Sequence, residues 1–283
     1  MQYQQTIASE LKISGTGLHS GTAVAMAILP QPVDTGILFR RSDLPDQPLI
    51  KADAHAVIDT RKSVTVGRDG WRIGTIEHLM AVFHGLGIDN ALVEVDGAEL
   101  PMGDGSALYF ARLILEKGLR VQEAPRRYTY IREPLWVEGN VQRQDEPCQA
   151  ILIGLPSDKF QVSFTFTSDH KATGTQFFQF TLGENNFLTE IAPARTIAFI
   201  KEIEYLRSQG LAMGNDLNSV VIVSEEGYEN PLRFTEEIVR HKILDLIGDL
   251  YLAGPLIGHF IAIRSGHSLD YKLVKKIKEV YHD

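Results

Sequence analysis

Hydrophobic residues in the first quarter of the chain occur in short runs or alternate with polar ones, and Pro, Gly and Asp separate the runs. A period of two places successive side chains on opposite faces of a strand. The pattern therefore predicts a series of short strands before the first helix. These strands are expected at Thr22–Leu29, at Gly36–Arg41 and around Lys51–Val57.

From Thr75 to Leu86 apolar residues recur at the spacing of one helix face, which predicts a helix. Thr75 is expected to cap this helix. Glu77 is expected in its first turn, where a carboxylate meets the positive end of the helix dipole. Gly85 and Gly87 then supply the stop. A buried strand at Asn90–Val95, a turn-rich loop at Pro101–Gly105 and a helix at Ser106–Lys117 are expected to follow.

The polar segment Arg120–Arg127 contains Pro125 and is interpreted as a linker. Beyond it, apolar or alternating runs predict further strands, and helical spacing predicts further helices. The expected strands are Tyr128–Val137, Ala150–Leu155, Phe160–Thr167, Phe177–Leu182, Ser219–Val223 and Leu256–Ile263. The expected helices are 201–209, Thr235–Leu252 and, after the loop Arg264–His267, Leu269–Tyr281.

Both halves of this predicted element order close in the same way, with a helix, a strand, a turn-rich loop and a second helix. Little residue identity accompanies the repeat, so it is one of architecture. We therefore expect an α+β fold of two related domains that face each other, residues 1–122 and 127–283. A site between two such domains would draw residues from both halves.

Composition narrows the class of protein. The chain has 283 residues, 44% of them hydrophobic and 23% charged, which is typical of one large or two medium globular domains. No apolar run long enough to span a membrane and no secretory signal is recognised. The net charge of -8 argues against broad nucleic-acid binding. Cys148 is the single cysteine, so any metal would be held mainly by His, Asp or Glu, and the cytoplasm is the expected compartment.

The first candidate chemistry lies in His241, Asp245 and Asp249. Their i, i+4, i+8 spacing places them along one stripe of a predicted helix. The other faces of this helix are largely apolar, and buried carboxylates are costly unless they are paired or bound to a metal. A metal site and an exposed stripe with salt bridges are about equally compatible with this pattern alone.

Glu77 and His78 form the second candidate element. Adjacent helix residues point about 100° apart, so one can bind a metal while the other acts as a base on the same water. Combined with His241 and Asp245, His78 makes a set of two imidazoles and one carboxylate that leaves a fourth position open, as a catalytic zinc site requires. Taken alone, a Glu-His dipeptide is more often a pair of surface residues.

His267 follows Ser265 and Gly266 after a predicted strand, on a loop well placed to reach a cleft. The architectural repeat places this loop beside the helix that carries Asp249, which could then orient the imidazole or stabilise its charge. Without that context, a loop histidine is more often a surface residue.

Two further features are interpreted as structural. The glycine-rich stretch Gly15–Gly21 lacks the glycine spacing and the following helix of a dinucleotide-binding fingerprint. His84 lies late in a predicted helix and is expected to be structural.

Several of these segments together resemble the UDP-3-O-acyl-N-acetylglucosamine deacetylase family, the zinc enzymes of lipid A synthesis in Gram-negative bacteria. The resemblance covers essentially the whole chain and rests on many matches in the same order. The matching segments are Gly15–Gly21, Thr75–Leu79, Gly85–Asn90, Asp104–Ser106, Ala194–Thr196, Arg240–Asp245 with Gly248 and Asp249, and Ser265–His267.

The resemblance implies two domains, each a helix layer on a β-sheet, with the helix layers packed face to face. It also implies a role for each matched residue. The implied metal ligands are His78, His241 and Asp245. The implied catalytic residues are Glu77 as base, His267 as general acid or oxyanion-stabilising cation with Asp249 behind it, Thr196 as a hydroxyl on the tetrahedral intermediate, and Lys242 as a cation near the scissile group and phosphates. The implied substrate contacts are Lys242, His19 and Arg264, with Phe199, Ile200 and Ile203 along the acyl chain.

The chain departs from the family pattern at three places. Ile197 stands where members often carry an aromatic residue, and Arg61-Lys62-Ser63 replaces a segment that is commonly apolar or contains cysteine. The second departure makes the rim of the site more basic. The segment 214–218 follows the pattern only loosely. These departures concern substrate contacts and acyl-chain length and leave the metal set intact.

The reaction implied is hydrolysis of the acetamide of a UDP-linked, 3-O-acylated N-acetylglucosamine, with Zn2+ or Fe2+ as the ion. Three alternatives stay open. One is a non-catalytic sugar-nucleotide binder on the same fold, another is a metalloenzyme for a different amide, and the third is a zinc that only joins the domains. The expected partner is a small acylated UDP-sugar. Nucleic-acid binding and stable membrane insertion are not expected. The protein is expected to be a monomer.

Overall fold

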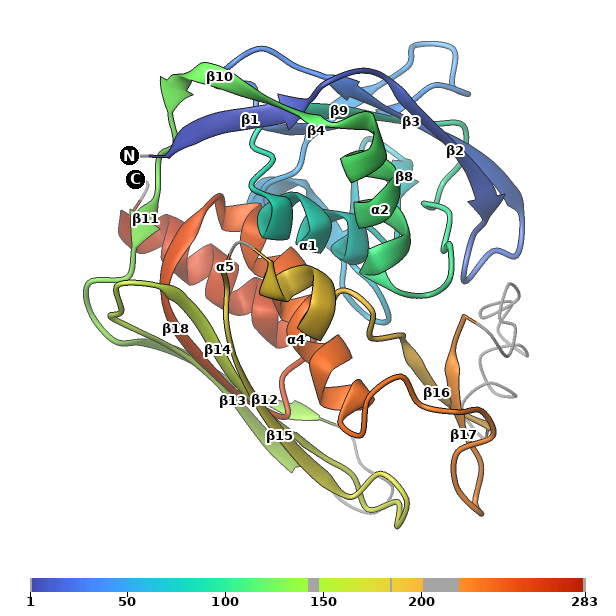
Figure 1. The fold of residues 1–283 in the computed structure, drawn as a ribbon. Helices are drawn as coiled ribbons and strands as arrows, with labels where there is room; N and C mark the ends of the chain where they lie inside the picture. Colours follow the sequence, from blue (N-terminus) through green and yellow to red (C-terminus); the bar gives the residue numbers. More distant parts are fainter. Residues whose placement is uncertain (1, 142–147, 184, 201–218, 282–283) are drawn as a thin grey trace.

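The computed structural model describes residues 2–141, 148–183, 185–200 and 219–281. Two β-sheets form the outer layers, and helices from both halves of the chain fill the space between them (Figure 1). Helix α1 (Glu77–Leu86) of the first half packs against α4 (Glu237–Leu250) of the second. The fold is therefore the α+β sandwich that the sequence predicted.

The sheet of the first half has five strands in the order β2-β3-β9-β4-β5. Its inward side chains, such as Met26, Val93 and Phe39, are buried against the helix layer. The strands are β2 (Leu11–Thr16), β3 (Ala23–Pro30), β4 (Ile37–Arg41), β5 (Leu49–Lys51) and β9 (Ala91–Val95), and α2 (Ala107–Lys117) lies beside α1. A small sheet of β6 (Val57–Asp59), β7 (Thr65–Arg68) and β8 (Trp71–Ile73), and the short 3-10 helix η1 (Ala54–Ala56), precede α1.

The sheet of the second half has the order β12-β13-β18-β14-β15, with β11 added beside β18. Its strands are β11 (Thr129–Tyr130), β12 (Leu135–Val141), β13 (Cys148–Leu155), β14 (Phe160–Thr167), β15 (Thr175–Thr181) and β18 (Leu256–Ile263). Its helices are the π-helix η2 (Phe187–Ile191), α4, the 3-10 helix η3 (Tyr251–Ala253) and α5 (His267–Tyr281). The short pair β16 (Ile197–Phe199) and β17 (Val221–Val223) stands apart from this sheet.

Both sheets have the same topology, which confirms the architectural repeat. In each half the last strand in the chain enters the middle of the sheet. Strand β9 is antiparallel to β3 and parallel to β4, and β18 is antiparallel to β13 and parallel to β14. Each central strand also follows one helix and precedes another, as α1-β9-α2 and α4-β18-α5. The site-bearing helices α1 and α4 are therefore equivalent elements of the two halves.

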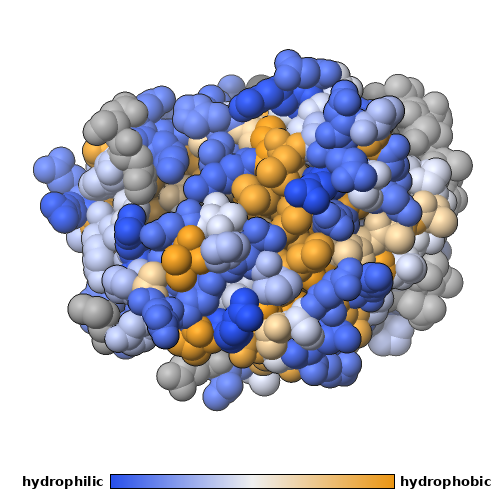
Figure 2. All heavy atoms as spheres, turned by 90° about the horizontal axis from the view of Figure 1, so that it is seen from above, coloured by the Kyte–Doolittle hydropathy of each residue, from blue (hydrophilic) through white to orange (hydrophobic). Residues whose placement is uncertain are grey.

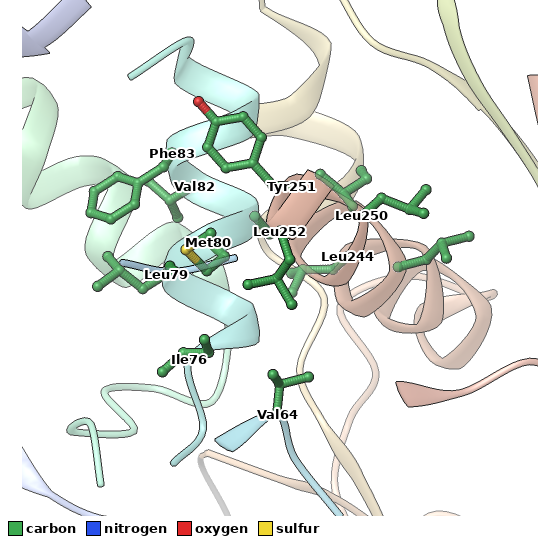
Figure 3. Packing of buried hydrophobic residues seen from close by; sticks show 14 of the residues in the cluster. Val64, Ile76, Leu79, Met80, Val82, Phe83, Leu244, Leu250, Tyr251 and Leu252 are labelled. Carbon is green, nitrogen blue, oxygen red and sulfur yellow. The ribbon is translucent and has the colours of Figure 1, made fainter. Parts of the chain in front are cut away.

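The backbones of helices α1 and α4 approach each other closely at Gly248. A Cβ atom on this residue would lie 2.1 Å from the carbonyl oxygen of Glu77, so only glycine fits. Beside this crossing, buried apolar side chains of α1, such as Met80, point toward the segment from Leu244 to Leu252 (Figure 3). The crossing brings the two halves together beside Glu77 and His78.

The segment interpreted as a linker is instead a strand. Residues Leu119–Pro125 form β10, which pairs antiparallel with β1 (Tyr3–Ile7). Most side chains of this two-stranded ribbon are at least partly exposed, so its composition is as polar as that of a linker. Pro125 lies at the strand end, a position that tolerates a missing N–H group. The boundary between residues 1–122 and 127–283 stays a prediction.

Thr75 is not the N-cap of α1. The helix begins at Glu77, Ile76 occupies the cap position, and no side chain caps the first turn. Thr75 has a positive φ of 58°, and its hydroxyl donates to Glu99 Oε1 at 3.0 Å. A hydroxyl committed to Glu99 does not serve the helix N–H groups.

Other boundaries also shift. His267 was expected on a loop but is the first residue of α5, because the helix starts two residues earlier than the apolar period indicated. The predicted strand Tyr128–Val137 is interrupted between β11 and β12, where Pro134 lies. The predicted strand around Lys51–Val57 is broken by η1. The predicted helix 201–209 lies outside the described residues.

The outer face of the first sheet is not uniformly polar. Seen from above, it carries a band of hydrophobic residues among polar ones (Figure 2). Strand register places Leu29, Leu92 and Leu38 in one row across the side of the sheet that faces away from the helices. Within the described residues, no helix has both the length and the apolar character needed to cross a membrane.

Candidate metal centre and active site

His78, His241 and Asp245 lie together in the buried layer between the two halves. The Oδ1 atom of Asp245 is 3.3 Å from His241 Nε2 and 3.6 Å from His78 Nε2. The two imidazole rings are nearly perpendicular, with centroids 4.9 Å apart. Two donor atoms that share a tetrahedral zinc at bond lengths of about 2.0–2.1 Å lie about 3.3 Å from each other. The spacing therefore suits one shared metal ion.

The protonation states of this set also suit a metal. His241 Nδ1 lies 3.0 Å from the carbonyl oxygen of Ala194, which requires the proton on Nδ1 and leaves Nε2 as the donor atom. Burial is the main cause that lowers the pKa of His241 to about 4, so the ring is neutral. Burial alone would raise the pKa of Asp245, but His241 and Lys242 hold it well below its usual range. A neutral imidazole and an ionised carboxylate are the forms that bind metals.

Lys242 lies at the edge of this set. Its Nζ atom donates to Asp245 Oδ2 at 2.7 Å. Burial would lower the pKa of Lys242, but the charge of Asp245 outweighs it and raises the pKa, so the side chain stays cationic. A cation is therefore present one hydrogen bond away from the three candidate ligands.

Glu77 precedes His78 at the first residue of α1 and is buried. Its Oε2 atom accepts a hydrogen bond of 2.9 Å from the backbone N–H of Val64. The crossing of α1 over Gly248 also fixes the backbone at Glu77. The carboxylate is thus held in one orientation beside a candidate metal ligand, as a base for water requires.

His267 and Asp249 form a close pair in the same layer. His267 Nδ1 lies 2.7 Å from Asp249 Oδ2, and Asp249 is 1% exposed. Burial alone would lower the pKa of His267, but the charge and hydrogen bond of Asp249, with smaller contributions from Asp245 and Glu77, raise it to about 10. The ring is therefore an imidazolium at neutral pH, which can donate a proton or stabilise a developing anion.

Asp270 is a buried acid that the sequence reasoning missed. One turn along α5 from His267, it accepts a hydrogen bond from the hydroxyl of Ser265. Candidate ligand atoms of Asp249, His267 and Asp270 all lie within 4.8 Å of one another. Burial and the charge of Asp249 raise the pKa of Asp270 to about 7. The i, i+3 spacing from His267 was the available sequence signal.

The segment Ala194–Thr196 reaches the metal set through its backbone. The carbonyl oxygen of Ala194 accepts a hydrogen bond from His241 Nδ1, and the N–H of Thr196 donates to the carbonyl oxygen of Gly105 at 3.1 Å. Thr196 thus lies two residues from the group that orients a candidate ligand. After Thr196 the chain enters β16, whose end residue Phe199 contacts the His170 ring at 5.8 Å between centroids.

The other predicted substrate contacts are spread around this layer. His19 has both ring nitrogens buried without a hydrogen-bond partner among the described residues. Burial is the main cause of its lowered pKa, and Lys62 and His267 also lower it. Arg264 donates to Thr167 Oγ1 and to the carbonyl oxygen of Gln149, so its guanidinium links β14 and β13, the two strands that flank β18. Ile200 is 36% exposed, and Ile203 lies outside the described residues.

His84, interpreted as structural, is fully buried away from the candidate ligands. It stacks on Tyr251 with centroids 4.7 Å apart, and its Nδ1 atom lies 3.2 Å from the carbonyl oxygen of Ile247. Burial lowers the pKa of His84 to about 3, so it packs as a neutral ring.

A buried ion pair anchors the segment Ala194–Thr196 to the start of α4. Arg195 Nε donates to Glu237 Oε1 at 2.9 Å, and the backbone N–H of Arg195 donates to the same oxygen at 3.0 Å. Glu237 is 0% exposed and Arg195 is 5% exposed. The pair therefore links the carbonyl that orients His241 to the helix that carries His241.

Replacing Glu237 with alanine is expected to lower the free energy of unfolding by about 3–5 kcal/mol, because it removes the carboxylate that balances the buried charge of Arg195. Urea denaturation at constant pH measures this change. Burial alone would raise the pKa of Glu237, but the hydrogen bonds and charge of Arg195 lower it. The contribution of this ion pair to the stability of the fold is therefore fully present above the unfolded pKa of glutamate, about 4.3, and is lost as pH falls toward the lower pKa of the folded protein. A change below about 1 kcal/mol would show that the pair is not needed for stability.

The class of protein that this fold and these donor atoms define is a metal-dependent hydrolase, with a carboxylate base and a cationic imidazole beside the metal set. Comparison with known proteins agrees with this class. A family model described as UDP-3-O-acyl N-acetylglycosamine deacetylase matches residues 4–279, and the chain belongs to this family.

Curated relatives support the same membership. A UDP-3-O-acyl-N-acetylglucosamine deacetylase of Myxococcus xanthus is 44% identical over 277 residues, which are 97% of this chain and 86% of the relative. The protein of the same name from Acidithiobacillus ferrooxidans is 43% identical over 280 residues, covering 97% and 89%. That of Syntrophotalea carbinolica is 41% identical over 280 residues, covering 98% and 88%.

Proposed function

We propose that this chain removes acetate from UDP-3-O-acyl-N-acetylglucosamine, a committed step of lipid A synthesis. His78, His241 and Asp245 are the proposed ligands of a Zn2+ ion, with Fe2+ as the alternative. The observation that carries the proposal is the convergence of these three donor atoms, one from the first half and two from the second, beside the buried carboxylate of Glu77. Membership of the deacetylase family supplies the substrate.

The donor set supports a catalytic rather than a purely structural ion. Two nitrogens and one carboxylate oxygen leave one tetrahedral position open, whereas structural zinc sites are closed by four protein ligands. A bound ion of this kind supplies a Lewis acid for the amide carbonyl and increases the acidity of the attacking water.

The protein side chains then divide the proton transfers. Glu77, fixed by the N–H of Val64, accepts the proton of the attacking water. His267, protonated because of Asp249, donates to the developing oxyanion or to the leaving nitrogen. We assign the hydroxyl of Thr196 and the ammonium of Lys242 to the stabilisation of the same negative charge. Water adds to the amide carbon, the C–N bond breaks, and acetate and a free amine leave.

The substrate contacts are proposed from the family resemblance and from their places in the fold. His19 offers two buried ring nitrogens to a polar group. Phe199 and Ile200, at the end of β16, are proposed for the acyl chain, with Ile203 beyond them. Arg264 is proposed as a further contact, although its side chain is bonded to Thr167 and Gln149.

Two departures from the family pattern also have places in the structure. Ile197 opens β16, next to Thr196. Arg61 is highly exposed and paired with Asp59 at 2.7 Å, whereas Lys62 lies close enough to lower the pKa of His19. We propose that Lys62, rather than Arg61, makes the mouth of the site more basic.

The proposal is tested by combining metal analysis with an acetate-release assay on the 3-O-acylated UDP-sugar and on UDP-N-acetylglucosamine without the acyl chain. We expect one metal ion per chain, release of acetate from the acylated sugar and loss of activity after chelation. Adding back Zn2+ should restore the activity. His241→Ala should lose the metal, whereas His84→Ala, which removes a buried histidine outside the set, should retain it.

Other results would favour the alternatives. Bound metal and a melting temperature lowered by chelation, without turnover, would indicate a metal that only joins the two halves. Acetate release that is equal with and without the acyl chain would indicate a different amide substrate. Binding of the UDP-sugar without metal would indicate a binding protein. We further propose a monomer that works in the cytoplasm, which light scattering and cell fractionation can test.

A further inference from the structure

Glu99 is a buried carboxylate outside the candidate metal centre, and it joins two separate segments. Its Oε1 atom accepts hydrogen bonds from the backbone N–H of His19 at 2.8 Å and from the hydroxyl of Thr75 at 3.0 Å. Its Oε2 atom accepts one from the backbone N–H of Ser20 at 2.9 Å. The side chain of Glu99 is thus held by three donors, two on the loop that carries His19 and one just before α1.

The first contact region is the loop Gly17–Thr22, part of the glycine-rich stretch that the sequence left without a function. The loop is closed by hydrogen bonds from Gly17 N–H to the Thr22 carbonyl and from Gly21 N–H to the Gly17 carbonyl, both 3.0 Å. A Cβ atom on Gly17 would lie 2.4 Å from Glu99 Oε2. A larger residue would have to displace the carboxylate, so glycine at this position lets Glu99 enter the loop and bind its N–H groups.

The loop presents an imidazole that has no partner of its own. Both ring nitrogens of His19 are buried without a hydrogen bond to any described residue. Burial lowers the pKa of His19, the charge of Glu99 raises it, and the charges of Lys62 and His267 lower it, so the ring lies within electrostatic range of His267 in the candidate site. A buried polar group without a partner is costly. The ring is therefore placed for a polar group of a bound molecule, and Glu99 holds the backbone from which it projects.

The second contact region is the entry to α1. Thr75 is a β-branched residue at φ 58°, a conformation that costs about 1–3 kcal/mol and persists only where the surrounding structure holds it. Its hydroxyl is held by Glu99, and the next residue, Ile76, donates its N–H to Val64 at 3.3 Å. Glu77 follows, and its carboxylate accepts from the N–H of the same Val64. The strained turn therefore sets where Glu77 and His78 begin the helix.

We propose that Glu99 is a positioning residue that couples the placement of His19 to the placement of Glu77 and His78. One carboxylate thereby sets the distance between a substrate contact and the reacting centre. The inference rests on the proposed function, because it assigns His19 to the substrate and Glu77 to the chemistry. Glu99 itself touches neither the candidate ligands nor the base.

The loop contact is tested with Glu99→Gln. The amide has the same shape, but it turns an NH2 group toward a donor, so at least one N–H of the loop loses its acceptor. We expect KM for the acylated UDP-sugar to rise about tenfold, as for the loss of one hydrogen bond to a charged group. In a His19→Ala background the same change should raise KM less than about twofold, because the group through which Glu99 acts is gone.

The helix contact is tested separately with Thr75→Val and Thr75→Ser. Valine keeps the shape and removes the hydroxyl, so kcat should fall about tenfold with KM unchanged. Serine keeps the hydroxyl and should restore kcat to within about twofold of the unsubstituted protein. A role in stability alone would not separate kcat from KM in this way.

The matched control is Glu94→Gln, which changes a glutamate of β9 paired with Arg40 of β4 and should leave both constants unchanged. An equal rise in KM from Glu99→Gln with and without His19 would overturn the inference, as would full activity of Thr75→Val. If Glu99→Gln does not fold, Gly17→Ala displaces the carboxylate from the loop and should also raise KM. Absence of acetate release by the unsubstituted protein would contradict the proposed function instead.

Discussion

Replacing Glu77 with alanine is expected to lower kcat by about 10²–10⁴-fold, the range typical of a lost general base. The carboxylate is buried at the first residue of α1, beside the candidate ligand His78, and a single backbone N–H fixes its orientation. No other carboxylate among the described residues is adjacent in sequence to His78. Acetate release at saturating substrate measures the loss, and metal content should stay at the level of the unsubstituted protein because Glu77 is not in the ligand set.

The control for this experiment is Glu77→Gln. Glutamine can still accept the N–H of Val64, so the start of α1 is preserved while the base is removed. Both variants should therefore lose activity to a similar extent. A glutamine variant with full activity would exclude Glu77 as the base, and an alanine variant that has lost its metal would assign it a role in binding the ion.

Replacing Asp249 with asparagine is expected to be almost as damaging, with a loss in kcat of about 10²–10⁴-fold near pH 8. The charge of Asp249 is the main reason that His267 keeps its proton to a pKa of about 10. Without that charge, burial lowers the pKa of His267 toward or below the ordinary value of about 6.5. The imidazolium that donates to the oxyanion is then mostly deprotonated at pH 8.

The direction of the pH dependence distinguishes this cause from a general loss of structure. A group that acts as an acid is active below its pKa, so lowering the pKa of His267 moves the basic limb of the kcat profile to lower pH. The Asp249→Asn variant should therefore recover part of its activity as pH falls toward about 6. A basic limb at the same pH in both proteins would show that Asp249 does not act through His267.

Much of the candidate site could be predicted from local spacing. His241 and Asp245 are four residues apart in a strongly apolar helical run, so a helix necessarily places them on one face. The order of helix, strand, loop and helix in both halves also indicated the α+β repeat, which the matching sheet topologies confirm. The first feature depends only on residue spacing within one helix, and the second depends only on the order of helices and strands along the chain. Both the spacing and the order can be recognised from the pattern of apolar residues.

Other elements could not be predicted, because their polar residues are satisfied by distant partners. Residues Leu119–Pro125 were interpreted as a linker, yet they form a strand because β1, more than a hundred residues earlier, supplies the other half of the ribbon. Thr75 is a residue type that often caps helices, but its hydroxyl donates its hydrogen bond to Glu99 instead. Glu99 carried no signal of its own, because it lies in a common turn context, and Asp270 offered only its i, i+3 spacing from His267.

By itself the sequence determined three features of this protein. The single cysteine leaves His, Asp and Glu as the main donor types, and the helical period of 3.6 residues places His241 and Asp245 on one stripe. The periods of two and 3.6 residues together give the order of strands and helices, and with it the repeated architecture. Only the tertiary structure decided that His78 meets this stripe and that His267 meets Asp249. For His78 the physical reason is the close crossing of α1 and α4 at Gly248, where the absence of a Cβ atom lets two helices from opposite halves touch at the backbone of Glu77. For His267 the reason is the packing of α5 against α4 within the second half. Such a contact depends on packing between elements, which local periodicity does not encode.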